Sequence, residues 1–288
     1  GKSTTCSIIK KVLESSGHNI VVVGNIGKPI LDYNFQRNTI AVIEMSSFQL
    51  EYSKYLRPNY AILLNISKDH LDWHGTMKNY INAKFKIFSY QNTNDFAYVF
   101  DDQRIINLYK RRKFKASLFV VKKNIKKFIK NKIKNNYLKS SNNVENLSFI
   151  YLLMKKFKIA DKFFFSSLKK FKGLPHRQEV FLKKNKISFI NDSKATSFEA
   201  SKSCLTNYKN IIWILGGLKK DGDRFFLNRI KKNIIKAFII GKDRSFFKKQ
   251  LRGKIDYKET LNLKNTVKHI YQELKFISLK KKKEEIFV

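Results

Sequence analysis

The chain has 288 residues, 43% of them hydrophobic, and a formal net charge of +38. This length can hold two domains that each bury a core, and the apolar content argues against wholesale disorder. No apolar run approaches the ~18 residues of a membrane-spanning helix, and the N-terminus shows no secretory leader. The only cysteines, Cys6 and Cys204, lack metal-ligand spacing, so we expect a reducing, cytoplasmic location without membrane contact.

In chain order, short β-branched runs alternate with longer amphipathic stretches, which is typical of a parallel sheet with crossover helices. The first half predicts strands at Asn19–Val23, Thr39–Glu44, Tyr60–Asn65 and Asp95–Phe100, and helices at Ser3–Ser16, Thr76–Tyr90, Asn146–Phe157 and Asp161–Phe171. The very basic stretch Lys110–Lys139 is interpreted as a solvated edge hairpin, with a nucleic-acid-binding arm as the less favoured alternative.

The loop Lys172–Gln178 separates the two halves, and the alternation then restarts. The second half predicts strands at Ile187–Asn191, Ile211–Leu215 and Ala237–Ile240, helices at Ser197–Thr206, Phe225–Lys232 and Leu263–Lys275, and a last apolar triplet at Ile286–Val288. A boundary near Gly173 gives two α/β domains, residues 1–172 and 173–288.

The basic excess has two interpretations. Lysine and arginine side chains could neutralise the phosphates of a nucleic acid. However, the lysines are scattered through every segment, together with many Asn, Ile and Phe residues. The sequence has neither zinc-ligand spacing nor an aromatic–glycine RNA-binding signature. We therefore favour a compositional bias in which lysines fill solvated faces, and we expect no nucleic-acid partner.

The first residues, Gly1-Lys2-Ser3-Thr4, stand at the mouth of the first predicted helix. They match the end of a G-x-x-x-x-G-K-[ST] phosphate loop, in which backbone N–H groups and the helix N-terminus bind phosphates. Lys2 would then reach the β- and γ-phosphates, and the Ser3 hydroxyl would ligate Mg²⁺. Taken alone, these residues are explained equally well by a helix cap.

Acidic and imidazole side chains follow two of the predicted strands. Glu44 ends one strand, and Asp69 and His70 follow the next. Ligands bind at the carboxyl ends of parallel strands, and oxygen-rich sites that retain phosphate ligands suit Mg²⁺. A single such residue is more often a capping or surface group, but two such loops beside a phosphate loop predict a divalent-metal site.

Five motifs occur in an order that resembles the D-glutamate-adding branch of the muramyl (Mur) ligase family. The motifs are Asn25–Gly27, Glu44–Glu51, Asp69–Asp72, Leu174–Arg177 and Asn191–Thr196. The resemblance covers essentially the whole chain and is weakest at 101–139 and after Gly241. It implies a P-loop-type central ATPase domain with a mostly parallel sheet, followed by a Rossmann-like C-terminal domain.

The resemblance also implies an activity. In this family the carboxylate of UDP-N-acetylmuramoyl-L-alanine attacks the γ-phosphate of ATP, and the amine of D-glutamate then displaces phosphate from the acyl phosphate. Such chemistry demands mainly positioning and charge neutralisation from the protein. The chain is accordingly expected to be a monomeric cytoplasmic enzyme of peptidoglycan precursor synthesis, acting on small molecules with ATP and Mg²⁺.

Residue roles follow from the same resemblance. Ser3 and Glu44 would hold one Mg²⁺, and His70 would help hold a second. Family members carry a CO₂-carbamylated lysine at this second ion, and the motif Asn82-Ala-Lys84 makes Lys84 the candidate. Carbamylation requires a neutral amine, which burial among cations favours. A solvated helix lysine is the alternative for Lys84.

Other implied roles concern ATP and the substrates. The ATP-binding set is Gly1, Lys2, Ser3, Thr4, Asn143, Arg177 and Asp192. The substrate-binding set is Asn25, Ser46, Gln49, Thr196 and Lys220, with Lys194 at the acyl phosphate. Alternatives remain open: Lys219 could replace Lys220, Asn25 could be ordinary turn chemistry, and Asn143 could be a helix cap.

Parts of the family pattern have no counterpart here. These are the UDP-binding N-terminal domain, the first half of the phosphate loop, and a C-terminal Ser-Pro-Ala segment. The sequence therefore predicts a fragment or a decayed gene product that is incomplete for activity. Two other functions remain as alternatives: a sibling muramyl or folyl-polyglutamate-type ligase, and a basic P-loop ATPase acting on nucleic acid. The latter gives no role to Glu44–Glu51 or Asn191–Thr196.

Overall fold

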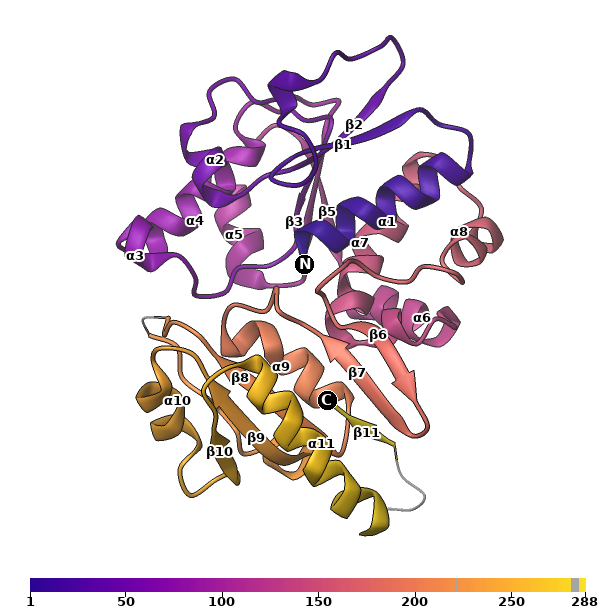
Figure 1. Cartoon of the computed structure of the whole chain (residues 1–288). Coiled ribbons are helices and arrows are strands. Elements are labelled where there is room, and N and C mark those ends of the chain that lie inside the picture. Colours follow the sequence, from indigo (N-terminus) through magenta and orange to yellow (C-terminus); the bar gives the residue numbers. More distant parts are fainter. Residues whose placement is uncertain (221, 281–284) are drawn as a thin grey trace. The chain divides into compact units, whose positions relative to one another are not determined.

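The computed structural model describes residues 1–220, 222–280 and 285–288, and only the backbone of 276–280. Contacts divide the chain into two compact units, Gly1–Phe171 and Lys172–Val288. Both units mix helices with largely parallel strands (Figure 1). None of the described helices combines the length and the apolar character that crossing a bilayer requires.

Unit 1, Gly1–Phe171, contains two groups of parallel strands. The two-stranded sheet pairs β1 with β2, and the three-stranded sheet has the order β3-β4-β5. Its elements are α1 Lys2–Ser15, β1 Ile20–Gly24, η1 Ile30–Asp32, β2 Ile40–Glu44, α2 Ser47–Tyr52, β3 Tyr60–Leu63, α3 Leu71–His74, α4 Met77–Phe85, η2 Lys86–Phe88, β4 Phe96–Phe100, α5 Gln103–Arg111, β5 Ser117–Val121, α6 Lys123–Lys132, η3 Tyr137–Lys139, α7 Ser141–Lys156 and α8 Asp161–Ser167.

Helices cover both faces of the three-stranded sheet. Side chains alternate along a strand, so Tyr98 of β4 packs into the cluster that includes α1, α6 and α7. Its neighbours Ala97 and Val99 face the opposite cluster, which includes Phe85 of α4 and Phe88 of η2. Burial on both faces explains why these strands read as continuous apolar runs.

The described residues of unit 2, Lys172–Val288, form a six-stranded sheet of order β10-β9-β8-β11-β7-β6, and among these strands only β6 is antiparallel to its neighbour. Phe198 and Phe247 pack on one face, and Ile270 and Leu274 pack on the other. The elements are β6 Glu179–Lys184, β7 Ile187–Asn191, α9 Phe198–Asn207, β8 Ile211–Gly216, η4 Lys231–Asn233, β9 Ile234–Ile240, α10 Arg244–Leu251, β10 Tyr257–Glu259, α11 Leu263–Lys280 and β11 Ile286–Phe287.

The prediction of a solvated edge hairpin in Lys110–Lys139 is wrong. The chain there forms β5, which pairs with β4 in parallel, followed by helix α6. Ile125, Ile129 and Ile133 recur at helical spacing, and Ile129 is fully buried. The lysines between these apolar residues obscured the helical period, because they lie on the solvated side of an amphipathic helix.

The predicted helix Phe225–Lys232 is also wrong. The segment is irregular and ends in the short 3-10 helix η4. Phe225, Leu227 and Ile230 are buried in the unit 2 core, at a spacing that no single helical face provides. Tertiary packing has therefore overridden local helix propensity here. The sequence prediction also omitted α2, β6 and α10.

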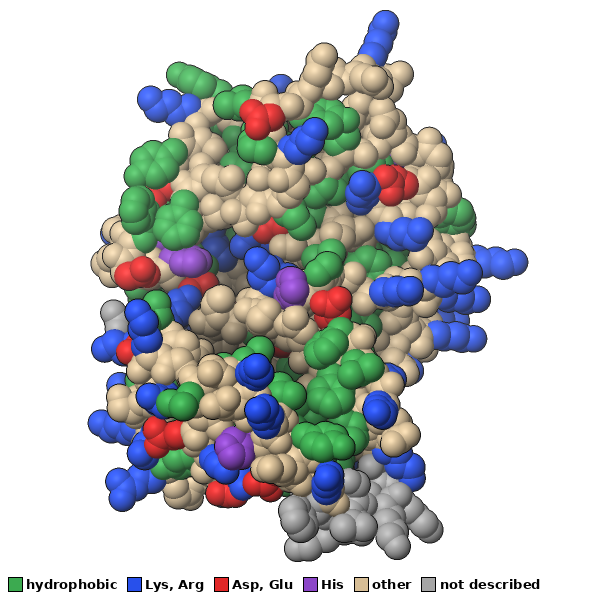
Figure 2. Space-filling view, in the orientation of Figure 1, with side chains coloured by type: hydrophobic (Ala, Val, Ile, Leu, Met, Phe, Trp, Pro, Cys, Tyr) green, Lys and Arg blue, Asp and Glu red, His purple; other side chains and the backbone are tan. Residues whose placement is uncertain are grey.

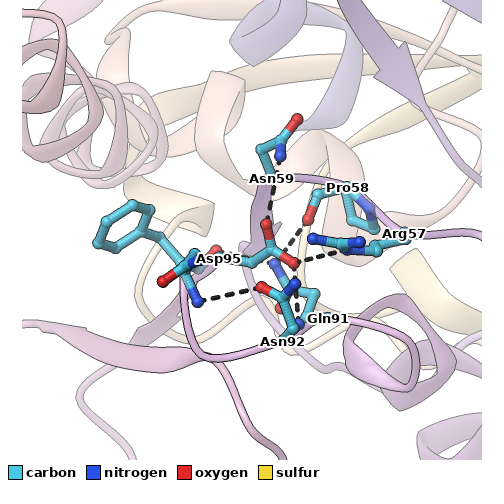
Figure 3. A network of polar contacts seen from close by, with 8 residues as sticks. Arg57, Pro58, Asn59, Gln91, Asn92 and Asp95 are labelled. Carbon is cyan, nitrogen blue, oxygen red and sulfur yellow. Dashed lines mark hydrogen bonds and ion pairs between the residues drawn. The ribbon is translucent and has the colours of Figure 1, made fainter.

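A buried carboxylate fixes the starts of two strands in unit 1 (Figure 3). Asp95 is 1% exposed and accepts hydrogen bonds from Arg57 Nε at 3.1 Å, Asn59 Nδ2 at 3.2 Å and the Asn92 backbone N–H at 2.8 Å. Burial alone would raise the pKa of Asp95, but these donors together hold it below its ordinary value. The network ties the segment before β3 to the turn before β4.

Replacing Asp95 with alanine is expected to lower the free energy of unfolding by about 2–4 kcal/mol, because three donors lose their acceptor. The depressed pKa means that the carboxylate stabilises the fold above its ordinary pKa, and that this contribution is lost as the pH falls through the lowered value. Urea titrations over a pH series measure both effects. Asp101→Ala, at the exposed position directly after β4, is the control and should change stability by less than about 0.5 kcal/mol.

Lysine and arginine side chains are dispersed among other side chains on the face shown in Figure 2. Several have local acidic partners, such as Lys236 with Glu273 at 2.6 Å and Lys126 with Glu145 at 2.6 Å. A dispersed distribution favours solubilising charge over a single phosphate-tracking groove.

Candidate functional site

Helix α1 begins unit 1 with the predicted phosphate-binding residues. Gly1 is its N-cap and provides no side-chain cap, and its first turn contains no acidic residue. Lys2 is exposed at this end, whereas Ser3 and Thr4 are 7% and 3% exposed. The positive end of the helix dipole and the Lys2 ammonium therefore favour an anion at the same place.

Glu44, the last residue of β2, has an unsatisfied oxygen. The side chain belongs to a residue that is 3% exposed, and its Oε1 accepts a hydrogen bond from Asn25 Nδ2 at 3.0 Å. Its Oε2 is buried and has no hydrogen-bond partner in the described part of the chain. A buried carboxylate oxygen is costly without a compensating partner, and a divalent cation is such a partner.

The turn after β1 packs directly on this strand end. The Asn25 backbone N–H donates to the Glu44 carbonyl oxygen at 2.8 Å. Gly24 has φ +101°, and a Cβ at that position would lie 2.5 Å from the same carbonyl oxygen. Glycine permits this close approach, which brings the predicted substrate residue Asn25 to the Glu44 carboxylate.

Ser46 and Gln49 form a capping box at the start of α2. The Gln49 backbone N–H donates to Ser46 Oγ at 3.2 Å, and Gln49 Oε1 accepts from the Ser46 backbone N–H at 2.9 Å. These contacts hold α2 in place directly after Glu44. The contact of Ser46 and Gln49 with substrate stays a prediction, because their polar groups already have this structural role.

His70 lies next to α2. Its backbone is left-handed, with φ +53°, and its Nε2 is 3.4 Å from Asp69 Oδ2. The ring centroid lies 4.9 Å from that of Phe48, in the first turn of α2. Since α2 follows Glu44 after two residues, the predicted ligands Glu44 and His70 belong to one end of the unit 1 strands.

Lys84 projects from α4 toward the same end. Its Nζ donates to the Asn65 carbonyl oxygen at 3.1 Å and lies 4.7 Å from the ring centroid of Tyr80. Burial, followed by repulsion from Lys2, lowers the pKa of Lys84 to about 8, and Asp69 opposes the shift. A lowered pKa provides the neutral amine that carbamylation requires.

The charges of Lys2 and Glu44 both affect the buried thiol of Cys6 in α1. Burial raises the pKa of Cys6 to about 12, with Glu44 adding to the rise and Lys2 opposing it. Lys2 also acts on Lys84. Lys2 therefore lies within electrostatic range of both Cys6 and Lys84, and Glu44 lies within electrostatic range of Cys6.

The side chains at this end of unit 1 can be compared with the ligands that Mg²⁺ requires. In the described part of the chain, no group of three or more His, Cys, Asp or Glu side chains gathers to hold a metal. Such a closed cage is not needed for Mg²⁺, which is usually held by one or two carboxylates together with substrate phosphates. The unpaired Glu44 oxygen fits that type of site.

In unit 2, Asp192 follows β7. Its Oδ1 accepts from the Gln178 backbone N–H at 3.0 Å, whereas Oδ2 is buried without a hydrogen-bond partner in the residues described. Burial raises the pKa of Asp192 to about 6, although the Gln178 N–H and Arg177 oppose the rise. Burying this carboxylate with one oxygen unpaired destabilises the fold, so the side chain is better explained as a ligand-binding group than as a stabilising one.

Replacing Asp192 with asparagine is expected to stabilise the protein by about 1–2 kcal/mol near pH 7, once solvent screening is allowed for. Because the native pKa is raised from 3.8 to about 6, stability of the parent falls as the pH rises through this window. The gain should vanish below the window, where both side chains are neutral. Melting temperatures of the two proteins across this range measure the difference, and a variant that is less stable at every pH would contradict the assignment.

The loop before β6 is pinned to the end of β7. The Lys194 backbone N–H donates to the His176 carbonyl oxygen at 3.1 Å, and the His176 ring lies 2.8 Å from Asn191 Nδ2. These contacts bring Arg177 beside Asp192, as the coupling between their charges shows. Lys194 follows directly, and Thr196 precedes the Ser197 cap of α9.

The remaining predicted positions are placed as follows. Asn143 lies in the first turn of α7 and donates from Nδ2 to the Tyr137 carbonyl oxygen at 2.9 Å, while Ser140 is the actual N-cap. Lys219 and Lys220 follow Gly216–Gly217 in a loop, and the Lys219 backbone N–H donates to Asp243 Oδ2 at 2.7 Å. Asp221 of that predicted loop lies outside the described residues.

Comparisons with known proteins decide the family. Residues 1–160 match the model of the Mur ligase middle domain, which is more than half of the chain. The chain belongs to the Mur ligase family.

Relatives of this Mur ligase chain are named UDP-N-acetylmuramoylalanine–D-glutamate ligase. One from Natranaerobius thermophilus is 33% identical over 299 residues, which cover 95% of this chain and 64% of the relative. One from a Wolbachia of Brugia malayi is 31% identical over 332 residues, with 95% and 66% covered. The chain thus spans slightly less than two thirds of their length.

The fold of the family is shared with solved structures. MurF ligase from Thermotoga maritima in complex with ADP superposes with a TM-score of 0.69 at 15% identity, covering 100% of this chain and 73% of that one. This likeness confirms the predicted α/β class, with a P-loop-type domain followed by a Rossmann-like domain.

Two residues that contact the predicted site residues or their neighbours were missed from sequence. Tyr80 is 3% exposed and precedes Lys84 by four residues, so the i,i+4 spacing signalled their contact. His74 is buried beside α2, and no sequence pattern distinguished it from a surface histidine. A cavity of about 570 Å³ elsewhere in unit 2, among Arg224, Phe226 and Lys249, includes none of the predicted residues.

Proposed function

We propose that this chain is the ATP-using part of a ligase that joins D-glutamate to UDP-N-acetylmuramoyl-L-alanine, a cytoplasmic step of peptidoglycan precursor synthesis. The observation that carries the proposal is the buried, unpaired Glu44 oxygen at the end of unit 1 where Lys2 and Lys84 also act. The names of the relatives supply the amino acid and the acceptor. The substrates are small molecules, and the enzyme is proposed to act as a monomer without nucleic acid.

Unit 1 activates the substrate carboxylate. The N-terminus of α1 and the Lys2 ammonium bind the ATP phosphates, with Gly1 and Thr4 in the same turn. Ser3 and Glu44 are proposed to hold one Mg²⁺, and His70 with carbamylated Lys84 a second; these ions would neutralise the charge of the transferring phosphoryl group. Asn25, with Ser46 and Gln49, orients the muramoyl substrate beside Glu44.

Unit 2 supplies the groups for the second half-reaction. Asp192 binds the ribose of ATP through its unpaired oxygen, and Arg177 lies beside it. Lys194 stabilises the acyl phosphate while Thr196 and Lys220 position D-glutamate. Asn143 of unit 1 contacts adenine. The tetrahedral intermediate gains negative charge, so fixed cations close to it lower the barrier.

The proposal is tested by phosphate release from ATP in the presence of UDP-N-acetylmuramoyl-L-alanine and a panel of amino acids, measured on purified protein that carries this chain. D-glutamate alone should stimulate release. Stimulation by another amino acid, or by a folate substrate with L-glutamate, would identify a sibling ligase. Release stimulated by an oligonucleotide in a salt-sensitive way would replace the ligase proposal with a nucleic-acid-dependent ATPase.

A further inference from the structure

His74, the last residue of α3, is a buried histidine without a role in the proposed reaction. It is 5% exposed, and its ring contacts α2 through both nitrogen atoms. Nε2 lies 3.0 Å from Ser47 Oγ, within hydrogen-bond distance. Nδ1 lies 3.4 Å from Glu51 Oε2, a longer contact that is not a hydrogen bond. One imidazole therefore cross-links α3 to α2.

Glu51 itself accepts two further hydrogen bonds, one at its carboxylate and one at its backbone. Its Oε2 accepts a hydrogen bond from Trp73 Nε1 at 3.1 Å. Its backbone carbonyl oxygen accepts a hydrogen bond from Lys86 Nζ. The His74 carbonyl oxygen also accepts from Asn79 Nδ2 at 3.0 Å. The cross-link thus joins α2, α3 and α4 into one fixed unit.

The same ring lies between the two groups proposed for the second ion. On one side His74 stacks on Phe48, with ring centroids 5.6 Å apart, and Phe48 contacts His70 at 4.9 Å. On the other side His74 contacts Tyr80 at 5.3 Å, and Lys84 Nζ lies 4.7 Å above the Tyr80 ring. His74 therefore supports His70 and Lys84 through one aromatic neighbour each.

The contacts link a carboxylate, an imidazole and a hydroxyl (Glu51, His74 and Ser47), as in the catalytic triad of a hydrolase. They do not form a catalytic triad. Ser47 is 6% exposed, and its hydroxyl is engaged with the imidazole inside the α2–α3 contact. A nucleophile must be within reach of its substrate, and this one is enclosed. The contacts of His74 are those of a supporting group.

We propose that His74 is a positioning residue, which holds Lys84 and His70 in the arrangement that binds the second divalent ion. The inference rests on the proposed function, because it requires Lys84 and His70 to serve that ion. Outer groups of this kind typically change metal affinity by about 10–100-fold when they are lost. Loss of the two nitrogen contacts should therefore loosen α2 against α3 and displace both side chains.

The test compares His74→Phe, which keeps the ring but loses both nitrogens, with His74→Gln, whose amide can still reach Ser47. The full chain is equilibrated with ¹³C-bicarbonate, and the carbamate signal of Lys84, identified by its loss in Lys84→Ala, is measured by NMR. Mn²⁺ affinity is measured in parallel by electron paramagnetic resonance. His18→Phe is the matched control, since His18 also contacts a serine, Ser16 at 3.0 Å, but lies away from this cluster.

The expected result is that His74→Phe weakens Mn²⁺ binding by about 10-fold or more and reduces the carbamate signal in proportion, while His74→Gln recovers most of both. A merely structural role predicts lower melting temperatures for both variants, with the carbamate signal and Mn²⁺ binding unchanged. That outcome overturns the inference about His74 but leaves the proposed function standing. A parent protein that gives no carbamate signal, and whose Mn²⁺ binding Lys84→Ala leaves unaltered, overturns the proposed role of Lys84 together with the inference.

Discussion

Replacing Glu44 with glutamine is expected to slow D-glutamate-dependent phosphate release by about 10²–10³-fold, because one charged partner of the transition state is lost. The variant keeps the size of the side chain and can keep a contact with Asn25, which now lies 3.0 Å from Oε1. Its melting temperature should not fall, since the substitution removes a buried negative charge whose Oε2 has no hydrogen-bond partner in the residues described. Steady-state kinetics and thermal melting on the same preparations separate the two effects.

Glu145→Gln is the control for this variant. Glu145 is a partly buried carboxylate of unit 1 that pairs with Lys126 at 2.6 Å and has no proposed part in the reaction. Its loss should leave the rate of phosphate release within about twofold, because this ion pair has no proposed part in the reaction. A Glu44→Gln variant with an unaltered rate and unaltered Mg²⁺ dependence would show that this carboxylate is not a ligand.

Replacing Gly216 with alanine is expected to destabilise unit 2 by about 3 kcal/mol or more. Gly216 ends β8 with φ +145°, and a Cβ there would lie 1.9 Å from the backbone oxygen of Ile240. Neither strand can yield easily, because β8 and β9 pair along their whole length in the centre of the sheet. The cost combines an unfavourable backbone conformation with a steric clash. Chemical denaturation of the variant measures it.

Gly253→Ala provides the comparison within the same unit. Gly253 also has positive φ, +70°, but an added Cβ would meet nothing within 4 Å. Only the conformational cost applies there, about 1 kcal/mol. Equal losses of stability in the Gly216→Ala and Gly253→Ala variants would show that β8 and β9 can move apart at Gly216 to accept the added Cβ.

Elements with a strong period could be predicted from sequence. The apolar runs of β1, β2 and β8 and the helices α1 and α9 were expected within a few residues of their observed bounds. The three strands are short, mostly apolar runs, and the two helices carry apolar residues at helical spacing. The errors fall where lysine-rich composition masks the period, as in α6, or where tertiary packing buries an irregular segment, as at Phe225 and Leu227.

The sequence could nominate candidate site residues, but it could not identify the side chains that contact them. Motif order predicted Lys2, Glu44 and Lys84, because each stands at a strand end or a helix position that the family resemblance supplied. The positions of His74 and Tyr80 were not predictable, because their importance arises from contacts between α2, α3 and α4. The unsatisfied oxygen of Glu44 likewise becomes visible only when every nearby donor has been placed.

Ser3, Glu44, His70 and Lys84 are proposed to surround a nucleotide-bound metal centre. Anomalous diffraction from crystals grown with Mn²⁺ and a non-hydrolysable ATP analogue would locate the ions. One peak is expected about 2.0–2.3 Å from a Glu44 carboxylate oxygen and the Ser3 hydroxyl, and a second beside His70 and Lys84. Bound nucleotide with Mn²⁺ peaks away from Glu44 and His70 would contradict it.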